Sequence, residues 1–358
     1  MEVDENDAAR PAAKDRGVKR VAFGDNGNIA AKGIVKPRGL QLKTTRSSNA
    51  QNENVVAPIT KKGRVTHVDE AEQNEVQRPS NGATSAECDL LTEDFVQEIK
   101  EYMLQLEERY AVDEMFLDGK AITSKMRCIL VDWLVQVHQR FHLLAETLHL
   151  TVYLVDRYLE EHSPEKADLQ LVGITAMLVA CKYEETYCPD IKDFEYITDC
   201  AFTKKQILRM EMHMIKSSRF DLGRVHSISF LRSFTTALDV NPQVHCTAKY
   251  LAELTLMDSN FSALRSSLIA AGSVWLAAQL KAVPLNVNKA FGHLPISNAA
   301  QEVKRMGIRV AACAVRIKLL GKLKAVMDKY ATVKAHHASQ LSINEEALLE
   351  KIMKMDSH

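Results

Sequence analysis

The chain has 358 residues, of which 46% are hydrophobic, and its 46 basic and 46 acidic side chains leave no net charge at pH 7. This balance excludes a protein that binds nucleic acid or membranes through its whole surface. It conceals a local excess, because residues 10–64 carry 13 basic and 3 acidic side chains. Seven cysteines, none spaced Cys-x-x-Cys, favour thiols in a reducing compartment over disulfides or zinc ligands.

The sequence offers no targeting segment for secretion or membrane insertion. The N-terminus is acidic and lacks an apolar core, which excludes a secretory signal peptide. The longest apolar run, Leu171–Cys181, is shorter than the roughly 20 residues that a membrane-spanning helix needs. We therefore expect a cytoplasmic and nuclear protein without a membrane partner.

Residues 1–88 are rich in Ala, Gly, Asn, Lys, Arg and Ser and show no sustained helical or strand period. Such a segment buries too little apolar surface to offset the entropy lost on ordering. We expect a disordered tail.

Helical spacing of apolar residues begins near Thr92, a candidate N-cap, and Gly119 interrupts it before Thr123 and Ser124, which are candidate caps for the next helix. From there to about Tyr330 the pattern predicts successive helices separated by proline-containing turns, and therefore an all-α fold. The expected helices span residues 124–141, 146–160, 169–185, 189–198, 203–217, 226–238, 242–257, 265–281, 286–291 and 298–320, with one more at 344–355.

The stretch Met126–Leu134 opens the first of these helices and is apolar on two faces. Met126, Ile129, Leu130 and Trp133 share one face, whereas Val131 and Leu134 lie on the opposite one. A helix of this kind is either enclosed by a bundle or buried on one side and open to a partner on the other. The spacing alone leaves both alternatives open.

Charged residues also occur inside apolar helices, at Arg127, Asp156, Lys182 and Glu211. Such groups are rarely buried unless they are paired. They are therefore solvated helix ends, internal ion pairs or contacts to a partner. The sequence lacks the glycine-rich, metal-binding and nucleophile motifs of common enzymes, so we expect a binding protein without catalytic residues, metal or cofactor.

Several long motifs resemble the mitotic cyclins. Met126–Val135 resembles the opening helix of the first cyclin box, with Cys128 in place of the usual alanine. Leu169–Gly173 and Ala180–Glu185 are similar to its third helix, and Thr203–Glu211 to its last. Lys329–Thr332 resembles the end of the second box. Gln136 and the run Gln105–Glu108 are more similar to B-type than to A-type cyclins.

The resemblance implies two tandem five-helix cyclin boxes. It divides the chain into a regulatory tail (1–88), an N-terminal helix and linker (89–123), box one (124–218), box two (219–340) and a C-terminal tail (341–358). It also implies a regulatory subunit that binds and activates a cyclin-dependent Ser/Thr kinase, in a 1:1 heterodimer, at the G2/M transition. Catalysis would belong to the kinase.

Individual residues match the family's signature positions. The resemblance implies that Lys182 and Glu211 contact the kinase, and that Tyr183, Glu184 and Glu185 extend this surface. Arg127 and Asp156 would pair internally to hold the first two helices in register, and Leu171 would belong to the core of box one.

The resemblance also implies a docking patch for Arg-x-Leu segments of substrates and inhibitors. The matching positions are Met126, Ile129, Leu130, Trp133, Gln136, Leu169 and Gln170, which would leave Val131, Leu134 and Val135 for the bundle. A buried leucine of the peptide would contribute roughly 1.5–3 kcal/mol. Gln136 stands where A-type cyclins carry an acidic residue that faces the peptide arginine.

In the tail, Arg20–Asn28 resembles the destruction box of mitotic cyclins, with Phe23 in place of the usual leucine. The resemblance implies recognition by the anaphase-promoting ubiquitin ligase and destruction at mitotic exit. The matching residues are Arg20, Phe23, Gly24, Asp25 and Asn28.

A basic run in the second box supports an alternative hypothesis. Seven basic residues follow one another there without an acidic one, from Lys304 to Lys324. They are typical of a solvated helix face, but a cyclin-box transcription adaptor that binds DNA would also carry them.

Overall fold

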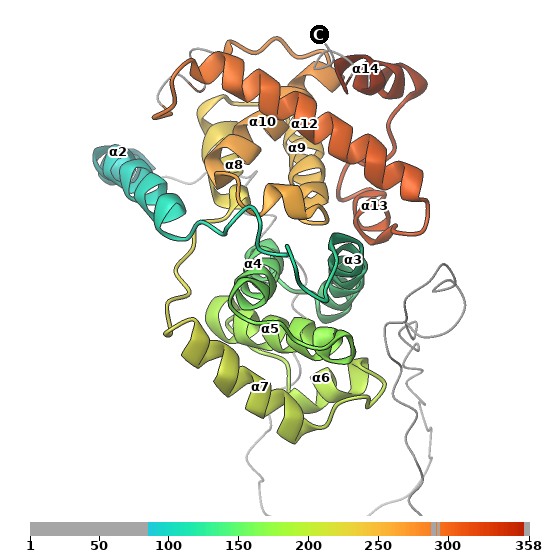
Figure 1. Cartoon of the computed structure of the whole chain (residues 1–358). Coiled ribbons are helices and arrows are strands. Elements are labelled where there is room, and N and C mark those ends of the chain that lie inside the picture. The colour runs from blue at the N-terminus through green and yellow to red at the C-terminus, as the bar shows by residue number, and fades with distance from the viewer. Residues whose placement is uncertain (1–84, 288–290, 292–293, 354–358) are drawn as a thin grey trace, which may run out of the picture. The chain divides into compact units, whose positions relative to one another are not determined.

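The computed structural model describes residues 85–287, 291 and 294–353, and every regular element among them is a helix (Figure 1). The predicted all-α fold is therefore confirmed. Almost all of the predicted disordered tail lies outside the described residues. Its last residues, from Ser85 on, belong to a helix instead.

Box one consists of five helices whose bounds lie within a few residues of the predicted ranges. They are α3 (Ser124–Phe141), α4 (Ala145–Glu161), α5 (Leu169–Glu184), α6 (Ile191–Ile197) and α7 (Lys204–Ser217). A short 3-10 helix, η1 (Lys166–Asp168), leads into α5.

In box two, four predicted helices are confirmed, and the predicted helix 286–291 lies partly outside the described residues. The four are α8 (Ser227–Ala237), α9 (Pro242–Thr255), α10 (Ser266–Leu280) and α12 (Ala299–Leu320), with the 3-10 helix η2 (Ser259–Phe261) between α9 and α10. Two helices follow, α13 (Ala325–Tyr330) and α14 (Ile343–Met353). The sequence pattern did not predict α13, because its 6 residues are too few to establish a period. No helix in the described part of the chain is long and apolar enough to cross a bilayer.

Local sequence explains where several helices begin. Thr123 caps α3, as predicted, by accepting a hydrogen bond from the Met126 amide at 3.3 Å. Thr203 and Gln206 form a reciprocal capping box at the start of α7. Asn241 caps α9, and Pro242 then occupies the first turn, where no amide hydrogen is needed.

Helix α2 (Ser85–Arg109) begins before the predicted start near Thr92, which lies inside the helix, so the predicted N-cap is wrong. The first part of α2, up to Tyr102, belongs to a structural unit separate from the one that begins at Met103.

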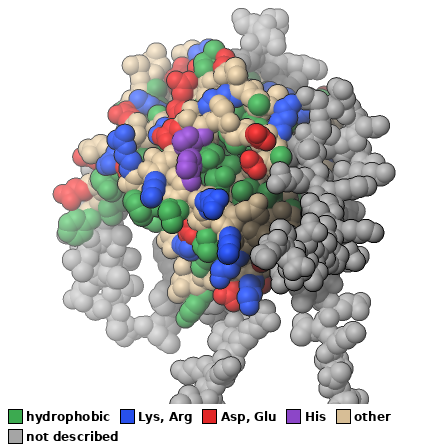
Figure 2. All heavy atoms as spheres, turned by 60° about the horizontal axis from the view of Figure 1, so that its bottom comes forward, with side chains coloured by type: hydrophobic (Ala, Val, Ile, Leu, Met, Phe, Trp, Pro, Cys, Tyr) green, Lys and Arg blue, Asp and Glu red, His purple; other side chains and the backbone are tan. Residues whose placement is uncertain are grey.

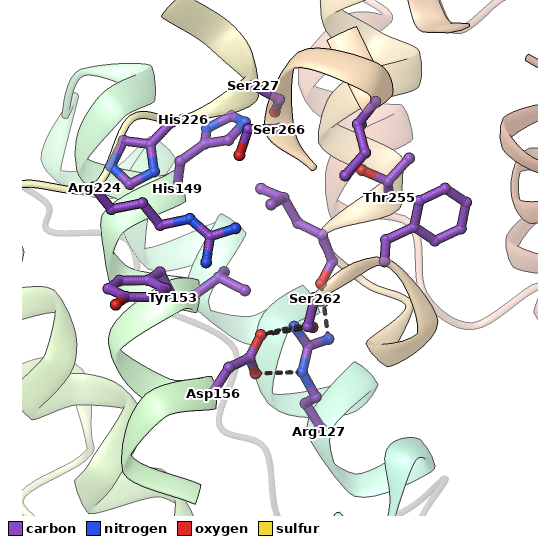
Figure 3. Close-up of a pocket in the computed structure, with 14 residues that line it drawn as sticks. Arg127, His149, Tyr153, Asp156, Arg224, His226, Ser227, Thr255, Ser262 and Ser266 are labelled. Atoms are coloured by element: carbon purple, nitrogen blue, oxygen red, sulfur yellow. Dashed lines mark hydrogen bonds and ion pairs between the residues drawn. The ribbon is translucent and has the colours of Figure 1, made fainter. Parts of the chain in front are cut away.

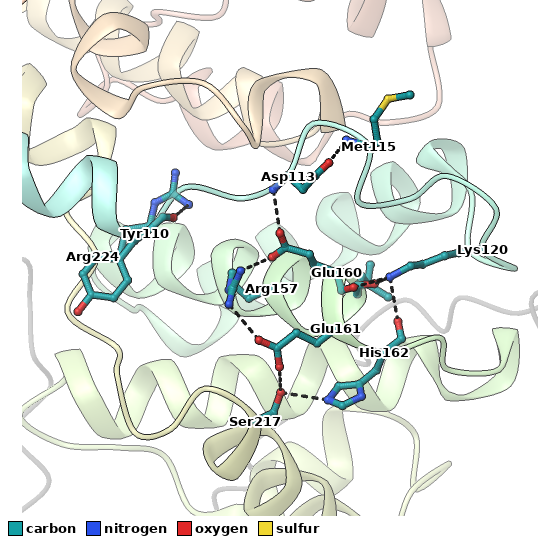
Figure 4. A network of polar contacts seen from close by, with 11 residues as sticks. Tyr110, Asp113, Met115, Lys120, Arg157, Glu160, Glu161, His162, Ser217 and Arg224 are labelled. Atoms are coloured by element: carbon teal, nitrogen blue, oxygen red, sulfur yellow. Dashed lines mark hydrogen bonds and ion pairs between the residues drawn. The ribbon is translucent and has the colours of Figure 1, made fainter.

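The linker between α2 and α3 is fastened to the end of α4 by polar contacts (Figure 4). The Asp113 amide donates to Glu160 Oε1 at 2.9 Å, and Lys120 Nζ donates to the Glu160 carbonyl at 2.7 Å. Arg157 pairs with both Glu160 and Glu161 and so holds these carboxylates in place. The linker therefore has a defined path over box one.

Each apolar face of α3 packs into a different core. Leu130, Trp133 and Leu134 belong to the core of box one. Val131 and Val135 belong instead to a core formed mainly by box two. The expectation that all of Val131, Leu134 and Val135 face the bundle of box one is therefore correct only for Leu134. The second apolar face of α3 exists because box two covers it.

The core of box two depends on a close crossing of α10 and α12. A Cβ atom on Gly307 would lie 2.1 Å from Trp275 Cε3, and one on Gly272 would lie 2.9 Å from the Gly307 amide nitrogen. Only glycine permits this approach. Cys313 lies in this core, and Cys128 packs against it from box one. No two of the described cysteines form a disulfide.

Candidate functional site

Lys182 and Glu211 lie on the surface of box one and form an ion pair with each other. Lys182 is in the last turn of α5, and Glu211 is on α7, which packs against α5. The Lys182 side chain is 49% exposed and that of Glu211 is 16% exposed. The pair is therefore open to solvent on the lysine side, where a partner's polar group has access to it.

The three residues after Lys182 have different surroundings. Tyr183 is 53% exposed, whereas Glu184 and Glu185 are half-buried. Glu185 Oε1 accepts a hydrogen bond from the Leu144 amide at 2.8 Å and another from the Thr147 hydroxyl. Since Leu144 is the N-cap of α4 and has no capping side chain, Glu185 fastens the start of α4 to the end of α5. Burial raises the pKa of Glu184.

Large exposed apolar side chains occur on α7 and shortly after α5, close in sequence to Glu211 and Lys182, and the sequence did not single them out. Leu208 and Met212 on α7 are 39% and 60% exposed, and Tyr187 is 77% exposed. Figure 2, which brings the α6–α7 end of box one toward the viewer, shows hydrophobic side chains among basic ones. Exposed apolar patches with polar rims are typical of protein-binding surfaces. We call this set the α5–α7 surface: Lys182, Tyr183, Glu184, Tyr187, Leu208, Glu211 and Met212.

A signal for this surface was present in the sequence of α7. Leu208, Glu211 and Met212 fall at i, i+3 and i+4, on a different face from Ile207 and Met214, which are buried. A short helix with two apolar faces needs something to cover the second one.

Arg127 and Asp156 form a buried ion pair between α3 and α4. Arg127 Nε lies 2.6 Å from Asp156 Oδ1, and the two side chains are 1% and 4% exposed. Arg127 Nη1 also donates to the Leu256 carbonyl at 2.8 Å, and the Ser262 hydroxyl donates to Asp156 Oδ2 at 2.7 Å (Figure 3). The pair therefore joins box one to box two as well as α3 to α4. Leu171 is in the core of box one.

The predicted docking patch is mostly buried. Leu130 and Leu169 are 1% and 0% exposed, and Met126 and Trp133 are 8% and 4% exposed. The accessible surface of the patch comes from three half-buried residues, Ile129, Gln136 and Gln170. Gln136 Nε2 donates to Asp132 Oδ2 at 3.0 Å, so its amide is oriented by its own helix. Docking of an Arg-x-Leu segment stays a prediction.

The destruction-box residues Arg20, Phe23, Gly24, Asp25 and Asn28 lie outside the described residues, so this motif also stays a prediction.

Part of the basic run of box two is used in contacts within the chain. Arg316 pairs with Asp258, Lys318 pairs with Glu346, and Arg309 stacks over the Phe261 ring at 5.7 Å. Three of the seven basic side chains are therefore engaged within the protein, which leaves fewer of them to bind DNA than the sequence indicates.

Family models match both halves of the described chain. The N-terminal domain of cyclins matches residues 98–223, and the C-terminal domain of cyclins matches residues 225–344. The X-ray structure of a viral cyclin from herpesvirus saimiri has the same fold, with a TM-score of 0.52 and 20% identity over 61% of this chain and 97% of the viral one. Two successive helical bundles of this kind define the cyclin class.

Curated relatives narrow the class. The chain is 39% identical to G2/mitotic-specific cyclin-B2 of Oryzias luzonensis over 73% of this chain and 72% of the relative. It is 39% identical to G2/mitotic-specific cyclin-B of Spisula solidissima, over 75% of this chain and 62% of that relative. A cyclin-B2 of Oryzias latipes is 48% identical, but the match spans only 49% of that protein. The chain belongs to the cyclin family, among the G2/mitotic-specific B cyclins.

Proposed function

We propose that this chain is the regulatory subunit of a cyclin-dependent Ser/Thr kinase and that it binds the kinase through the α5–α7 surface. The observation that carries this proposal is the accessible Lys182–Glu211 pair, together with exposed apolar side chains on the same helix as Glu211 and next to Lys182 in the chain. Charged groups at the centre of an apolar surface favour one partner and one orientation over others.

The activation mechanism follows from differential binding. A surface that binds the active arrangement of a kinase more tightly than the inactive one raises the population of the active arrangement. Helices α5 and α7 suit this role, because packed helices present a fixed surface and lose little entropy on binding. The chain contributes no reacting group, since catalysis belongs to the kinase. The relatives of this chain are named G2/mitotic-specific cyclins, which supports entry into mitosis as the process that the complex controls.

Substitution of the pair tests the interface. Lys182→Ala combined with Glu211→Ala should abolish co-purification of the kinase from dividing-cell extract, while helical circular dichroism is unchanged. The matched control is Lys318→Ala with Glu346→Ala, which removes another exposed Lys–Glu pair, between α12 and α14. Kinase binding that survives the first double substitution, or fails equally in the control, contradicts the proposal.

For substrate docking we propose that Ile129 and Gln170 supply the accessible part of the Arg-x-Leu site, over the buried Leu130 and Trp133. Ile129→Ala with Gln170→Ala should slow phosphorylation of Arg-x-Leu substrates more than that of short peptides without the motif. Equal slowing of both would contradict a docking role.

We further propose that Arg20–Asn28 directs ubiquitin-dependent destruction at mitotic exit, and that the protein occupies both cytoplasm and nucleus. Arg20→Ala with Phe23→Ala should prolong the lifetime of the protein in mitotic extract. Arg38→Ala with Val35→Ala changes the same classes of residue outside the motif and should leave the lifetime unchanged.

The proposed location in cytoplasm and nucleus is tested by following a fluorescent fusion of the chain through the cell cycle.

A further inference from the structure

A cavity of about 50 Å³ lies between the two boxes (Figure 3). Box one contributes α4 to its wall, and box two contributes the residues around the starts of α8 and α10. Its lining is unusually polar for an interior: Arg224, His149, His226, Ser227, Ser266 and Tyr153. A polar cavity of this size holds water or a small ion.

Arg224 supplies a positive charge to the cavity. Its guanidinium stacks on the Tyr153 ring at 4.5 Å and donates a long hydrogen bond of 3.4 Å to the Tyr110 carbonyl. Figure 3 shows the guanidinium directed into the cavity. No carboxylate among the described residues forms an ion pair with Arg224, although guanidinium groups away from bulk water usually have one.

Two histidines line the cavity, and the tautomer of His149 is fixed by its helix. His149 Nδ1 lies 2.9 Å from the Ala145 carbonyl oxygen, which can only accept, so Nδ1 carries the hydrogen and Nε2 offers a lone pair. His149 Nε2 and His226 Nε2 are both buried without a hydrogen-bond partner, on rings whose centroids are 5.9 Å apart. Both residues are 5% exposed, and burial lowers the pKa of each, so both are neutral near pH 7.

Two carboxylates act electrostatically on Arg224, and both already have other hydrogen-bond partners. Asp156 is held by Arg127 and Ser262, and Glu107 accepts hydrogen bonds from the amide and the hydroxyl of Ser267 at 2.8 and 2.7 Å. Helix α8 starts beside the cavity without a capping side chain, so the positive end of its dipole adds to the charge of Arg224. The cavity therefore combines a guanidinium without an ion-pair partner among the described residues with a hydrogen-bond acceptor on His149.

We propose that this cavity binds one hydrogenphosphate ion, whose ionised oxygens face Arg224 and whose P–O–H group donates to a histidine Nε2. An oxyanion without a proton satisfies the arginine but places its lone pairs against the lone pair of His149 Nε2. Sulfate is such an ion at neutral pH. The site should therefore select phosphate over sulfate by the hydrogen that only phosphate carries.

Calorimetric titration of the full chain without kinase tests this selection. At about pH 7.5, inorganic phosphate should bind with 1:1 stoichiometry and about tenfold or more tighter than sulfate. O-phosphoserine, a larger monoester, should bind more weakly than the free ion. Absence of phosphate binding, equal affinity for sulfate, or tighter binding of phosphoserine overturns the proposal.

Two substitutions place the binding in this cavity. Arg224→Gln should weaken phosphate binding by about tenfold or more, whereas Arg305→Gln, on the exposed face of α12, should leave it unchanged. His149→Gln puts an N–H donor where the lone pair was, so it should raise the affinity for sulfate relative to phosphate. This ratio decides the question even where Arg224→Gln fails to fold. A ratio that His149→Gln does not alter, or an equal loss in both arginine variants, contradicts the assignment.

Discussion

Two ion pairs between helices of box one look alike in the sequence and differ in the structure. Arg127–Asp156 and Lys182–Glu211 both join residues 29 positions apart, and each residue lies within an apolar helix. The side chains of the first pair are 1% and 4% exposed, whereas Lys182 of the second is 49% exposed. The first pair has further partners in box two, and the second lies among exposed apolar residues.

The difference in burial gives the two pairs different weights in folding. A buried charge must be fully paired, so Arg127 and Asp156 depend on each other and on box two for the fold. An exposed pair contributes little to folding, which leaves Lys182 and Glu211 available for the kinase contact proposed above. Burial, rather than residue type, therefore distinguishes the two pairs.

The largest expected loss of stability follows from breaking the Arg127–Asp156 pair between the two boxes. Arg127→Met leaves the Asp156 carboxylate buried with only Ser262 as a close donor, and should lower the free energy of unfolding by about 3–5 kcal/mol. Asp156→Leu added to Arg127→Met should recover part of this loss, because no charge is then left unpaired. Chemical denaturation followed by circular dichroism measures both. If the single variant lost less than about 1 kcal/mol, the Arg127–Asp156 pair would contribute no more than an exposed ion pair does, which contradicts its structural role.

Lowering the pH should also reduce the free energy of unfolding, mainly through the protonation of a buried histidine. Burial lowers the pKa of His138 to about 3, from an ordinary value of 6.5. Because the unfolded chain then takes up the proton first, the stability associated with neutral His138 is present above pH 6.5 and is lost as the pH falls toward 3. One pKa unit corresponds to about 1.4 kcal/mol, so this histidine alone should cost about 1.4 kcal/mol by pH 5.5.

His138→Phe provides the measurement. Its free energy of unfolding should fall less than that of the unsubstituted chain between about pH 7.5 and 5.5, by about 1.4 kcal/mol. Parallel curves for His138→Phe and the unsubstituted chain would show that His138 is not buried in its neutral form.

Much of the fold was predictable, because helical periodicity and proline positions are local properties of the sequence. The start of α3 at Ser124 follows from the cap at Thr123. The packing of Val131 and Val135 on box two was not predictable, since periodicity shows that a face is apolar and not which partner covers it. The helix α13 is fixed partly by a contact distant in sequence, in which Asp132 Oδ1 accepts from the Ala325 amide at 3.0 Å.

The candidate site was also predicted only in part. The resemblance to the mitotic cyclins supplied Lys182 and Glu211, but Leu208 and Met212 required knowledge of which face of α7 is buried. Glu185 was assigned to the kinase surface by its place in a motif, whereas the hydrogen bonds that it accepts from Leu144 and Thr147 fasten the start of α4 to the end of α5. A sequence motif is matched as a unit, and only coordinates separate its buried members from its accessible ones.

The smallest expected effect is the coupling energy between Lys182 and Glu211, and its measurement distinguishes this pair most directly from Arg127–Asp156. Lys182→Ala, Glu211→Ala and their combination form a double-mutant cycle, whose coupling energy in the free chain should not exceed about 1 kcal/mol, because Lys182 is largely solvated. Raising the salt concentration should reduce that coupling further, since exposed charges are screened. The same cycle measured on kinase affinity should give a larger coupling, because the partner excludes water from the pair. If the coupling energy in the free chain were as large as the loss expected for Arg127→Met, Lys182–Glu211 would be a second structural pair, and its effect on kinase binding would follow from folding alone.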